Sequence, residues 1–183
     1  VAVNAIAITE LTGDATTIKS ALASNGITTV TNNSLAVKVD SGTASVTEIN
    51  TINSDTATGE VTATVTSGAA SVLKSLTTTS TDAITMTVNA EASGATAAAD
   101  LVSLNGNTNK AITMTAVTSV SGSYADLFNV YVTNANEYTG VGDEAVAITG
   151  SVTATEADTI ADATSGIVTA TIDANTAAVL NAA

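Results

Sequence analysis

Short stretches of alternating apolar and polar residues recur along the chain. An apolar or β-branched residue occupies every second position, which is the period of a strand with one buried face. The alternation predicts strands near residues 3–9, 35–39, 60–66, 83–88, 111–116, 144–149 and 166–172.

Segments with helical spacing lie between these strands. Their apolar faces are formed by Ile18, Ala21 and Leu22; Val72, Leu73 and Leu76; Ala97, Ala98, Leu101 and Leu104; and Tyr124, Leu127, Phe128 and Tyr131. A short strand followed by a short helix, repeated along a chain, is typical of α/β folds with parallel sheets. We therefore expect an α/β protein whose strand–helix units stack into a solenoid-like parallel layer. Because Thr and Val favour strands, an all-β sandwich or β-solenoid stays open as the alternative.

The pattern repeats at a longer distance. Segments return after about 107 residues, as 5–9 and 111–115, 36–39 and 145–148, 47–52 and 155–160, and 59–65 and 166–172. This predicts two units, residues 1–107 and 108–183, of which the second is incomplete. A unit that stops early suggests a piece of a longer array, or an end that receives a neighbour.

Composition narrows the function. The chain has 4 Lys+Arg against 17 Asp+Glu, a net charge of −13, and no Cys, His, Pro or Trp. The commonest general base, the strongest nucleophile and the usual zinc ligands are therefore missing, so we expect no enzyme. Nucleic acid would meet a chain of its own sign, and no stretch approaches the length of a membrane span. The acidic, Thr-rich composition favours an extracellular or cell-surface location.

Threonine pairs form the most regular polar feature. Alternation places both members of a pair on one strand face, as in Thr62/Thr64, Thr85/Thr87, Thr113/Thr115 and Thr169/Thr171. The plain interpretation is a solvent-facing strand surface. The functional one is a Thr ladder that binds glycan or ice, although Lys38 and Ala147 interrupt the pattern.

Three further features suggest chemistry. Glu137, Asp143 and Glu144 are a weak calcium candidate, as are Glu156, Asp158 and Asp162, although neither group has a recognised calcium-loop pattern. Ser71 and Lys74 have the spacing of a serine nucleophile and its base, but the partner motifs are missing, so we expect no site there. The aromatic residues cluster in one segment, at Tyr124, Phe128, Tyr131 and Tyr138. The cluster suggests either a local core or a contact between subunits.

A family resemblance rests on three strings, which are Ser121–Leu127, Thr139–Val146 and Gly166–Ile172. They resemble tandem Thr/Ala-rich repeats of very large surface proteins of marine bacteria, notably cyanobacteria. The resemblance implies a secreted or cell-surface structural role and carries no catalytic residue.

Two functions follow as expectations. The first is a structural protein, a subunit or segment of a filament, sheath, surface layer or virion appendage that forms a homo-oligomer or polymer by strand pairing. The second is an adhesin-type module that recognises glycan or ice through its Thr-rich face. No cofactor is expected, and calcium bridging between units stays open.

Overall fold

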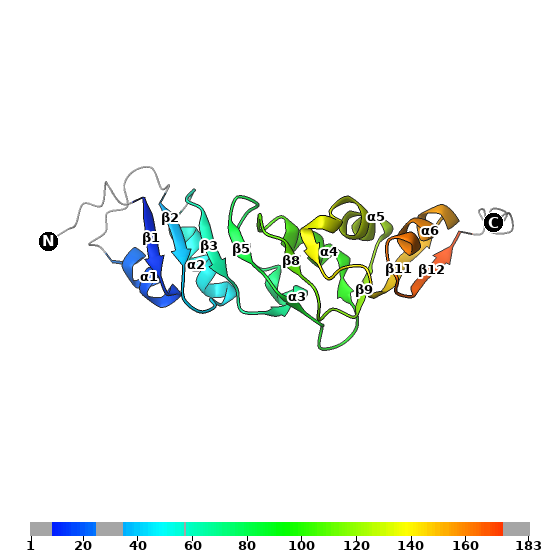
Figure 1. Ribbon diagram of the computed structural model, residues 1–183, viewed down its shortest axis with the longest axis horizontal. Coiled ribbons are helices and arrows are strands. Elements are labelled where there is room, and N and C mark those ends of the chain that lie inside the picture. The colour runs from blue at the N-terminus through cyan, green and yellow to red at the C-terminus, as the bar shows by residue number, and fades with distance from the viewer. Residues whose placement is uncertain (1–8, 25–34, 57, 174–183) are drawn as a thin grey trace. The chain divides into compact units, whose positions relative to one another are not determined.

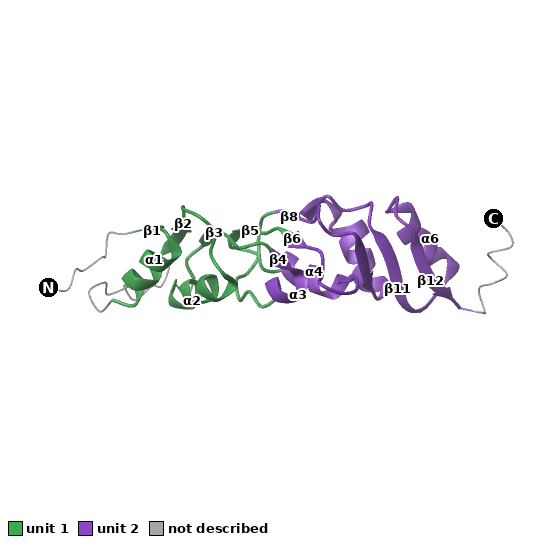
Figure 2. Cartoon of the chain, turned by 90° about the horizontal axis from the view of Figure 1, so that it is seen from below, with its two compact units in different colours: residues 1–67, 75–87, 106–110 green, residues 68–74, 88–105, 111–183 purple. Residues whose placement is uncertain are grey.

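The computed structural model describes residues 9–24, 35–56 and 58–173 (Figure 1). The chain divides into two compact units (Figure 2), unit 1 comprising residues 1–67, 75–87 and 106–110, and unit 2 residues 68–74, 88–105 and 111–183. These units do not follow a cut after residue 107, and the repeat boundary there stays a prediction. Most of the strand expected over residues 3–9 lies outside the described residues.

Unit 1 contains one parallel sheet in the order β1-β2-β3-β5. Its strands are β1 (Glu10–Gly13), β2 (Ala36–Val39), β3 (Val61–Thr64) and β5 (Ala83–Thr85). Helix α1 (Ala15–Leu22) connects β1 to β2 and packs on α2 (Val46–Thr56), which connects β2 to β3 and contacts both. The first three strands and two helices therefore form a βαβαβ segment.

Unit 2 contains a four-stranded parallel sheet in the order β12-β11-β9-β7 and two short parallel pairs, β4-β6 and β10-β8. The strands are β4 (Gly68–Ala69), β6 (Val88–Asn89), β7 (Thr96–Ala97), β8 (Ile112–Thr113), β9 (Ser119–Gly122), β10 (Tyr138–Thr139), β11 (Ala145–Val152) and β12 (Val168–Ile172). The helices are α3 (Ala70–Leu73), α4 (Ala98–Asn105), α5 (Tyr124–Phe128), the π-helix η1 (Asn129–Thr133), the 3-10 helix η2 (Ala135–Glu137) and α6 (Ala154–Asp162).

A second βαβαβ segment lies within unit 2, formed by β9, α5, β11, α6 and β12. Its strand register matches that of unit 1. Inward-facing residues lie side by side as Leu11, Val37 and Val61 in unit 1, and as Val120, Val146 and Val168 in unit 2. The repeat found in the sequence therefore corresponds to a repeated pattern of strand pairing.

The cores are mostly aliphatic. Ile18, Ile49 and Ile52 of the helices and Val61 of β3 are each at most 1% exposed in unit 1. In unit 2 the fully buried helix residues include Leu101, Leu104, Leu127 and Ile160. Each such side chain contributes about 1.5–3 kcal/mol on burial, so stability is spread over many small contacts.

Helix starts are defined by polar side chains. In unit 1 the Ser45 hydroxyl accepts from the Glu48 amide, and Glu48 Oε2 accepts from the Ser45 amide at 3.0 Å. Thr153 and Glu156 form the same capping box at the start of α6, with a Thr153 amide bond of 2.8 Å. This reciprocal S/T-x-x-E pattern satisfies amides that a helix leaves unpaired. Both helices α2 and α6 begin where this pattern stands in the sequence.

A glycine precedes the last strand of each βαβαβ segment. A Cβ at Gly59 would lie 1.9 Å from the Leu35 carbonyl oxygen, and a Cβ at Gly166 would lie 1.9 Å from the Glu144 carbonyl oxygen. No side chain fits at such a separation, so glycine is required at both positions for the backbone segments to approach.

The α/β class with parallel sheets is confirmed, and the all-β alternative is wrong because helices join the parallel strands. Among the described residues, none of the helices has the length and apolar character needed to cross a bilayer.

Candidate functional site

The Thr-rich face of unit 1 is interrupted. Thr62 lies opposite Lys38 on one side and opposite the buried Ala83 on the other. Thr64 lies opposite Thr85, and both are exposed. Thr87 follows β5 and is half-buried. The Thr62/Thr64 and Thr85/Thr87 pairs are therefore shifted by two residues relative to each other. As a result, Thr64 and Thr85 are the only two of these four threonines that lie opposite each other.

The remaining threonines are in unit 2, in two different sheets. Thr113 of β8 pairs with Thr139 of β10, and the exposed Thr115 follows β8. Thr169 and Thr171 of β12 lie opposite Ala147 and Ser151. The described strands therefore do not join the eight predicted threonines into one ladder. Recognition of glycan or ice through such a face stays a prediction.

The aromatic residues divide into two pairs. The Tyr124 and Phe128 rings lie 5.6 Å apart at 47° on α5, and both residues are half-buried. Tyr131 and Tyr138 are each only 4% exposed, and the Tyr138 hydroxyl donates to the Leu101 carbonyl oxygen at 3.1 Å. These two tyrosines belong to the core of unit 2, as in the local-core alternative, and a subunit contact through Tyr124 and Phe128 stays a prediction.

Glu144 is the centre of a buried polar cluster in unit 2. It is 1% exposed, and its Oε2 accepts from the Tyr131 hydroxyl at 3.2 Å, the Gly142 amide at 2.8 Å and the Asp143 amide at 3.2 Å. Its Oε1 is buried, and none of the described residues forms a hydrogen bond with it. Burial, together with the Glu144 charge, raises the pKa of Tyr131 far above its usual value.

This cluster does not match the predicted calcium site. Glu137 and Asp143 are exposed, whereas Glu144 is buried and bonded to its own loop. Within the described ranges, no three acidic side chains converge closely enough to hold a metal ion. In the other acidic group, Glu156 caps α6. Glu144 and Glu156 thus have structural roles in their loop and helix, and calcium binding by the remaining acidic residues stays a prediction.

Ser71 and Lys74 are also separately engaged. The Ser71 hydroxyl donates to Glu91 Oε2 at 2.8 Å, and the Lys74 ammonium lies 2.9 Å from Asp100 Oδ1. The two side chains therefore contact different carboxylates, Glu91 and Asp100.

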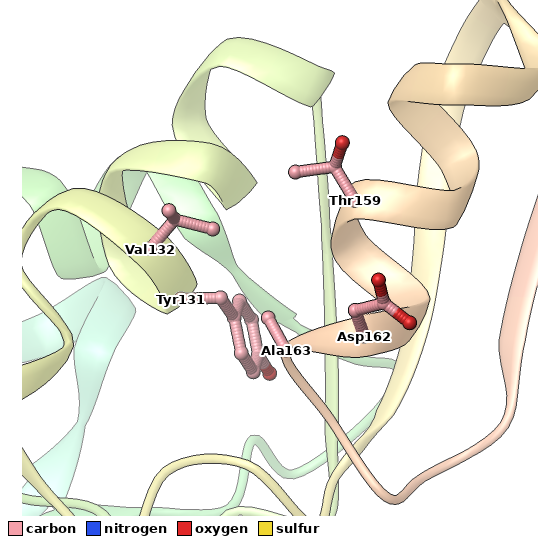
Figure 3. Close-up of a pocket in the computed structure, with 5 residues that line it drawn as sticks. All are labelled: Tyr131, Val132, Thr159, Asp162 and Ala163. Atoms are coloured by element: carbon pink, nitrogen blue, oxygen red, sulfur yellow. The ribbon is translucent and has the colours of Figure 1, made fainter.

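An open pocket of about 370 Å³ lies beside α6 (Figure 3). Its lining is Tyr131, Val132, Thr159, Asp162 and Ala163. The pocket offers one carboxylate, one threonine hydroxyl and apolar groups, with the Tyr131 hydroxyl already bonded to Glu144. A lone carboxylate beside apolar groups suits a weak surface contact better than acid–base work, which needs a second polar group in reach of the substrate.

The outer strand of the unit 2 sheet is incompletely buried. In unit 1, the inward-facing residues of β3 are buried, with Val61 0%, Ala63 3% and Val65 2% exposed. Their counterparts in β12 are all half-buried, namely Val168, Ala170 and Ile172. Within the described chain, β3 pairs with strands on both sides, whereas β12 pairs with β11 alone.

An apolar side chain adds to this surface. Ile167, directly before β12, is 79% exposed, and its counterpart in unit 1 is Glu60. Exposed strand edges with apolar side chains favour pairing with another chain. Sequence alternation marked β12 as a strand but carried no signal that its edge would be open. We take the β12 edge as the candidate functional site.

No family model, curated protein or solved structure matches this chain.

Proposed function

We propose that this chain is a non-enzymatic structural segment of an extracellular filament, sheath, surface layer or virion appendage. Its parallel strand–helix units assemble by stacking and strand pairing at the sheet edges. The observation that carries the proposal is the β12 edge. The inner apolar residues of β12 are half-buried, whereas the equivalent residues of β3 are buried. Burial of this surface supplies the driving force for assembly.

The repeated βαβαβ segment supports the same proposal. Parallel units joined through backbone ladders can add further units in the same register, because each strand offers the next one the same hydrogen-bonding edge. The aliphatic cores and the threonine-bearing outer faces suit a protein whose purpose is to hold a shape. The stacking of units into a continuous solenoid belongs to this proposal.

Charge sets the conditions for assembly. A chain of charge −13 repels its own copies at low ionic strength. We expect assembly to strengthen as salt rises towards about 0.15 M, where the Debye length falls to about 8 Å. Calcium could also bridge acidic side chains of neighbouring copies. In that case it should lower the protein concentration needed for assembly more than sodium chloride of equal ionic strength does.

Electron microscopy of the native, untagged chain tests the proposal, together with sedimentation across a concentration series at low and physiological salt. Regular filaments, tubes or a lattice are the expected result. A chain that stays monomeric throughout the series, with and without calcium, would overturn the proposal.

A further inference from the structure

The pairing of β3 with β5 in unit 1 shows what kind of strand would cover the edge of β12. Strand β5 pairs in parallel with β3, placing Ile84 beside Ala63 on the inner face and Thr85 beside Thr64 on the outer face. Both Ile84 and Ala63 are buried, at 0% and 3% exposed. Ala170, the counterpart of Ala63, is half-buried. A strand with a branched apolar residue at the inner position would complete β12 in the same way.

The opposite deficit is found at β1 in unit 1. Its counterpart β9 pairs with β7, and Val120 of β9 is 0% exposed. Leu11 occupies the equivalent inner position of β1 and is only half-buried. Within the described chain, β1 pairs with β2 alone. Each unit therefore has one outer strand with a half-buried inner face, β1 in unit 1 and β12 in unit 2. The equivalent strands of the other unit, β9 and β3, have buried inner faces.

We propose that β12 of one copy of this chain pairs in parallel with β1 of a second copy. This inference rests on the proposed structural function and names its partner. The register follows the β3–β5 contact, so that Thr169 lies opposite Glu10, Ala170 opposite Leu11 and Thr171 opposite Thr12. Leu11 then takes the place that Ile84 occupies beside Ala63.

Side-chain alternation supports this register. Both strands have apolar residues at their inner positions and polar ones at their outer positions. A shift by one residue would place Leu11 on the outer face beside threonine, where it gains no burial. The register also sets no like charges opposite one another, because Glu10 is the only charged residue among the six and Thr169 faces it.

The pairing is head-to-tail, since it joins two different surfaces of the same chain. After such a head-to-tail contact, the β1 edge of the first copy and the β12 edge of the second copy are still open, and each can pair with a further copy. The geometry then produces a ring or an open filament, depending on the rotation between successive copies. A two-fold dimer, by contrast, would join like surfaces.

Disulfide trapping tests the register directly, because the chain has no cysteine of its own. Single variants Thr12→Cys and Thr171→Cys are mixed under mild oxidation, and the products are resolved without reductant. Directly opposed residues on paired strands lie within the Cα separation that a disulfide accepts. The expected product is a covalent dimer of the two variants that reductant dissolves. The register control is Thr169→Cys mixed with Thr12→Cys, and we expect it to give much less dimer.

Charge substitution supplies an independent readout. Ala170→Glu would bury a carboxylate at the proposed contact and should raise the concentration needed for assembly by about 100-fold. Its matched control is Ala147→Glu, which adds the same charge to the exposed outer face of β11, and should change that concentration by less than about threefold. Circular dichroism is used to check that both variants are folded.

The outcomes separate this inference from the proposed function. Assembly by the native chain, without trapping between the Thr12→Cys and Thr171→Cys variants, would overturn the pairing and leave the structural function standing, with another segment covering β12. Self-trapping of either single variant at comparable yield would replace head-to-tail pairing with a two-fold contact. A native chain that never assembles would overturn both.

Discussion

The two βαβαβ segments share a register but differ at one backbone contact. In unit 1 the carbonyl over Gly59 belongs to Leu35, and in unit 2 the carbonyl over Gly166 belongs to Glu144. The carboxylate at the second position is buried and takes hydrogen bonds from Tyr131 and two loop amides. The same backbone geometry is therefore found with an apolar and with an acidic residue, and at the acidic one Tyr131 and the loop amides supply donors to one of the two carboxylate oxygens.

A second difference lies in the outer strands. β3 is covered by β5, whereas the matching strand β12 is half-open. Identical alternation thus leads to a buried strand in one unit and an accessible edge in the other. Burial is decided by the neighbouring strand, and this is why the open edge carries the functional proposal.

The largest expected effect concerns the two glycines. Gly59→Ala and Gly166→Ala should each destabilise their unit by about 3 kcal/mol or more, because the new methyl group would overlap a backbone oxygen that cannot move away. Urea unfolding monitored by circular dichroism measures the loss. Gly68→Ala is the control, since its Cβ would meet Leu73 at an ordinary 3.7 Å. Equal tolerance of all three substitutions would show that the close backbone approach does not require glycine in either unit.

The next effect separates the covered strand from the open one. Val61→Ala should cost about 2 kcal/mol, because two buried methyl groups are lost from a packed site. Val168→Ala should cost less than half of that in the dilute monomer, since Val168 is half-buried. Unfolding curves at low protein concentration provide the comparison. An equal cost for both substitutions would mean that the β12 face is already covered in the monomer.

Alkaline pH should affect the units differently. Burial raises the pKa of Tyr131 and of Tyr138 above the usual value of 10.0, so folding favours the protonated phenol. This stabilisation is fully present below about pH 10 and is lost above it, by about 1 kcal/mol per tyrosine at pH 11. All three tyrosines of the chain are in unit 2. Loss of structure that begins in unit 1 on raising pH would contradict this prediction, and Tyr131→Phe should reduce the effect.

Acid should destabilise unit 1, just as alkali destabilises unit 2. The Thr17 hydroxyl lowers the pKa of Asp14, and the Ser45 amide lowers the pKa of Glu48. Their contribution is present above the unfolded pKa values and is lost as pH falls through the lowered ones, below about pH 4. Amide hydrogen exchange at acid pH should therefore show fraying at the starts of α1 and α2.

The smallest effect concerns the capping boxes. Ser45→Ala and Thr153→Ala should each cost about 1 kcal/mol, because the Glu48 and Glu156 amides lose their side-chain acceptor. Thermal unfolding of the two variants measures the loss. Thr47→Ala is a matched control for unit 1, because Thr47 is an exposed residue of α2, and it should change stability by less than about 0.5 kcal/mol. Unequal costs for the two caps would indicate that only one helix depends on its box.

Alternation along the chain predicted several strands and apolar helix faces well. Strands β2, β3, β11 and β12 and helices α1 and α4 lie where the pattern placed them. The stretch expected over 83–88 divides into β5 and β6, which belong to different sheets. Periodicity cannot foresee this division, because it does not specify which strand pairs with which.

Helices α2 and α6 were missed, as were β1 and β9. The two helices are rich in Thr, Asn and Asp, so their apolar spacing is weak, with Ile52 and Ile160 as the matching buried positions. Their capping boxes at Ser45 and Thr153 were the available signal. Strands β1 and β9 each contain one large apolar residue, Leu11 or Val120, and end in a glycine, so their alternation is too weak to be recognised from the sequence.

The candidate site was predicted in part. Alternation placed Thr169 and Thr171 on one face of β12, and the structure agrees. It could not give the stagger between β3 and β5, which brings Thr62 opposite Ala83. Nearness in sequence grouped the aromatic residues, but the fold buried Tyr131 and Tyr138 and left Tyr124 and Phe128 half-buried.

The amino-acid sequence by itself favoured the α/β class, with an all-β fold left open. It also contained the repeat of about 107 residues and indicated the faces on which apolar side chains lie, because these features depend on local periodicity. Only the tertiary structure decided which strand edges are covered, which threonines are neighbours and which groups donate hydrogen bonds to Glu144 Oε2. Those properties depend on contacts between residues far apart in the chain, such as Thr64 with Thr85 and Tyr131 with Glu144. Pairing and burial are properties of neighbours, and the order of residues along one strand does not contain them.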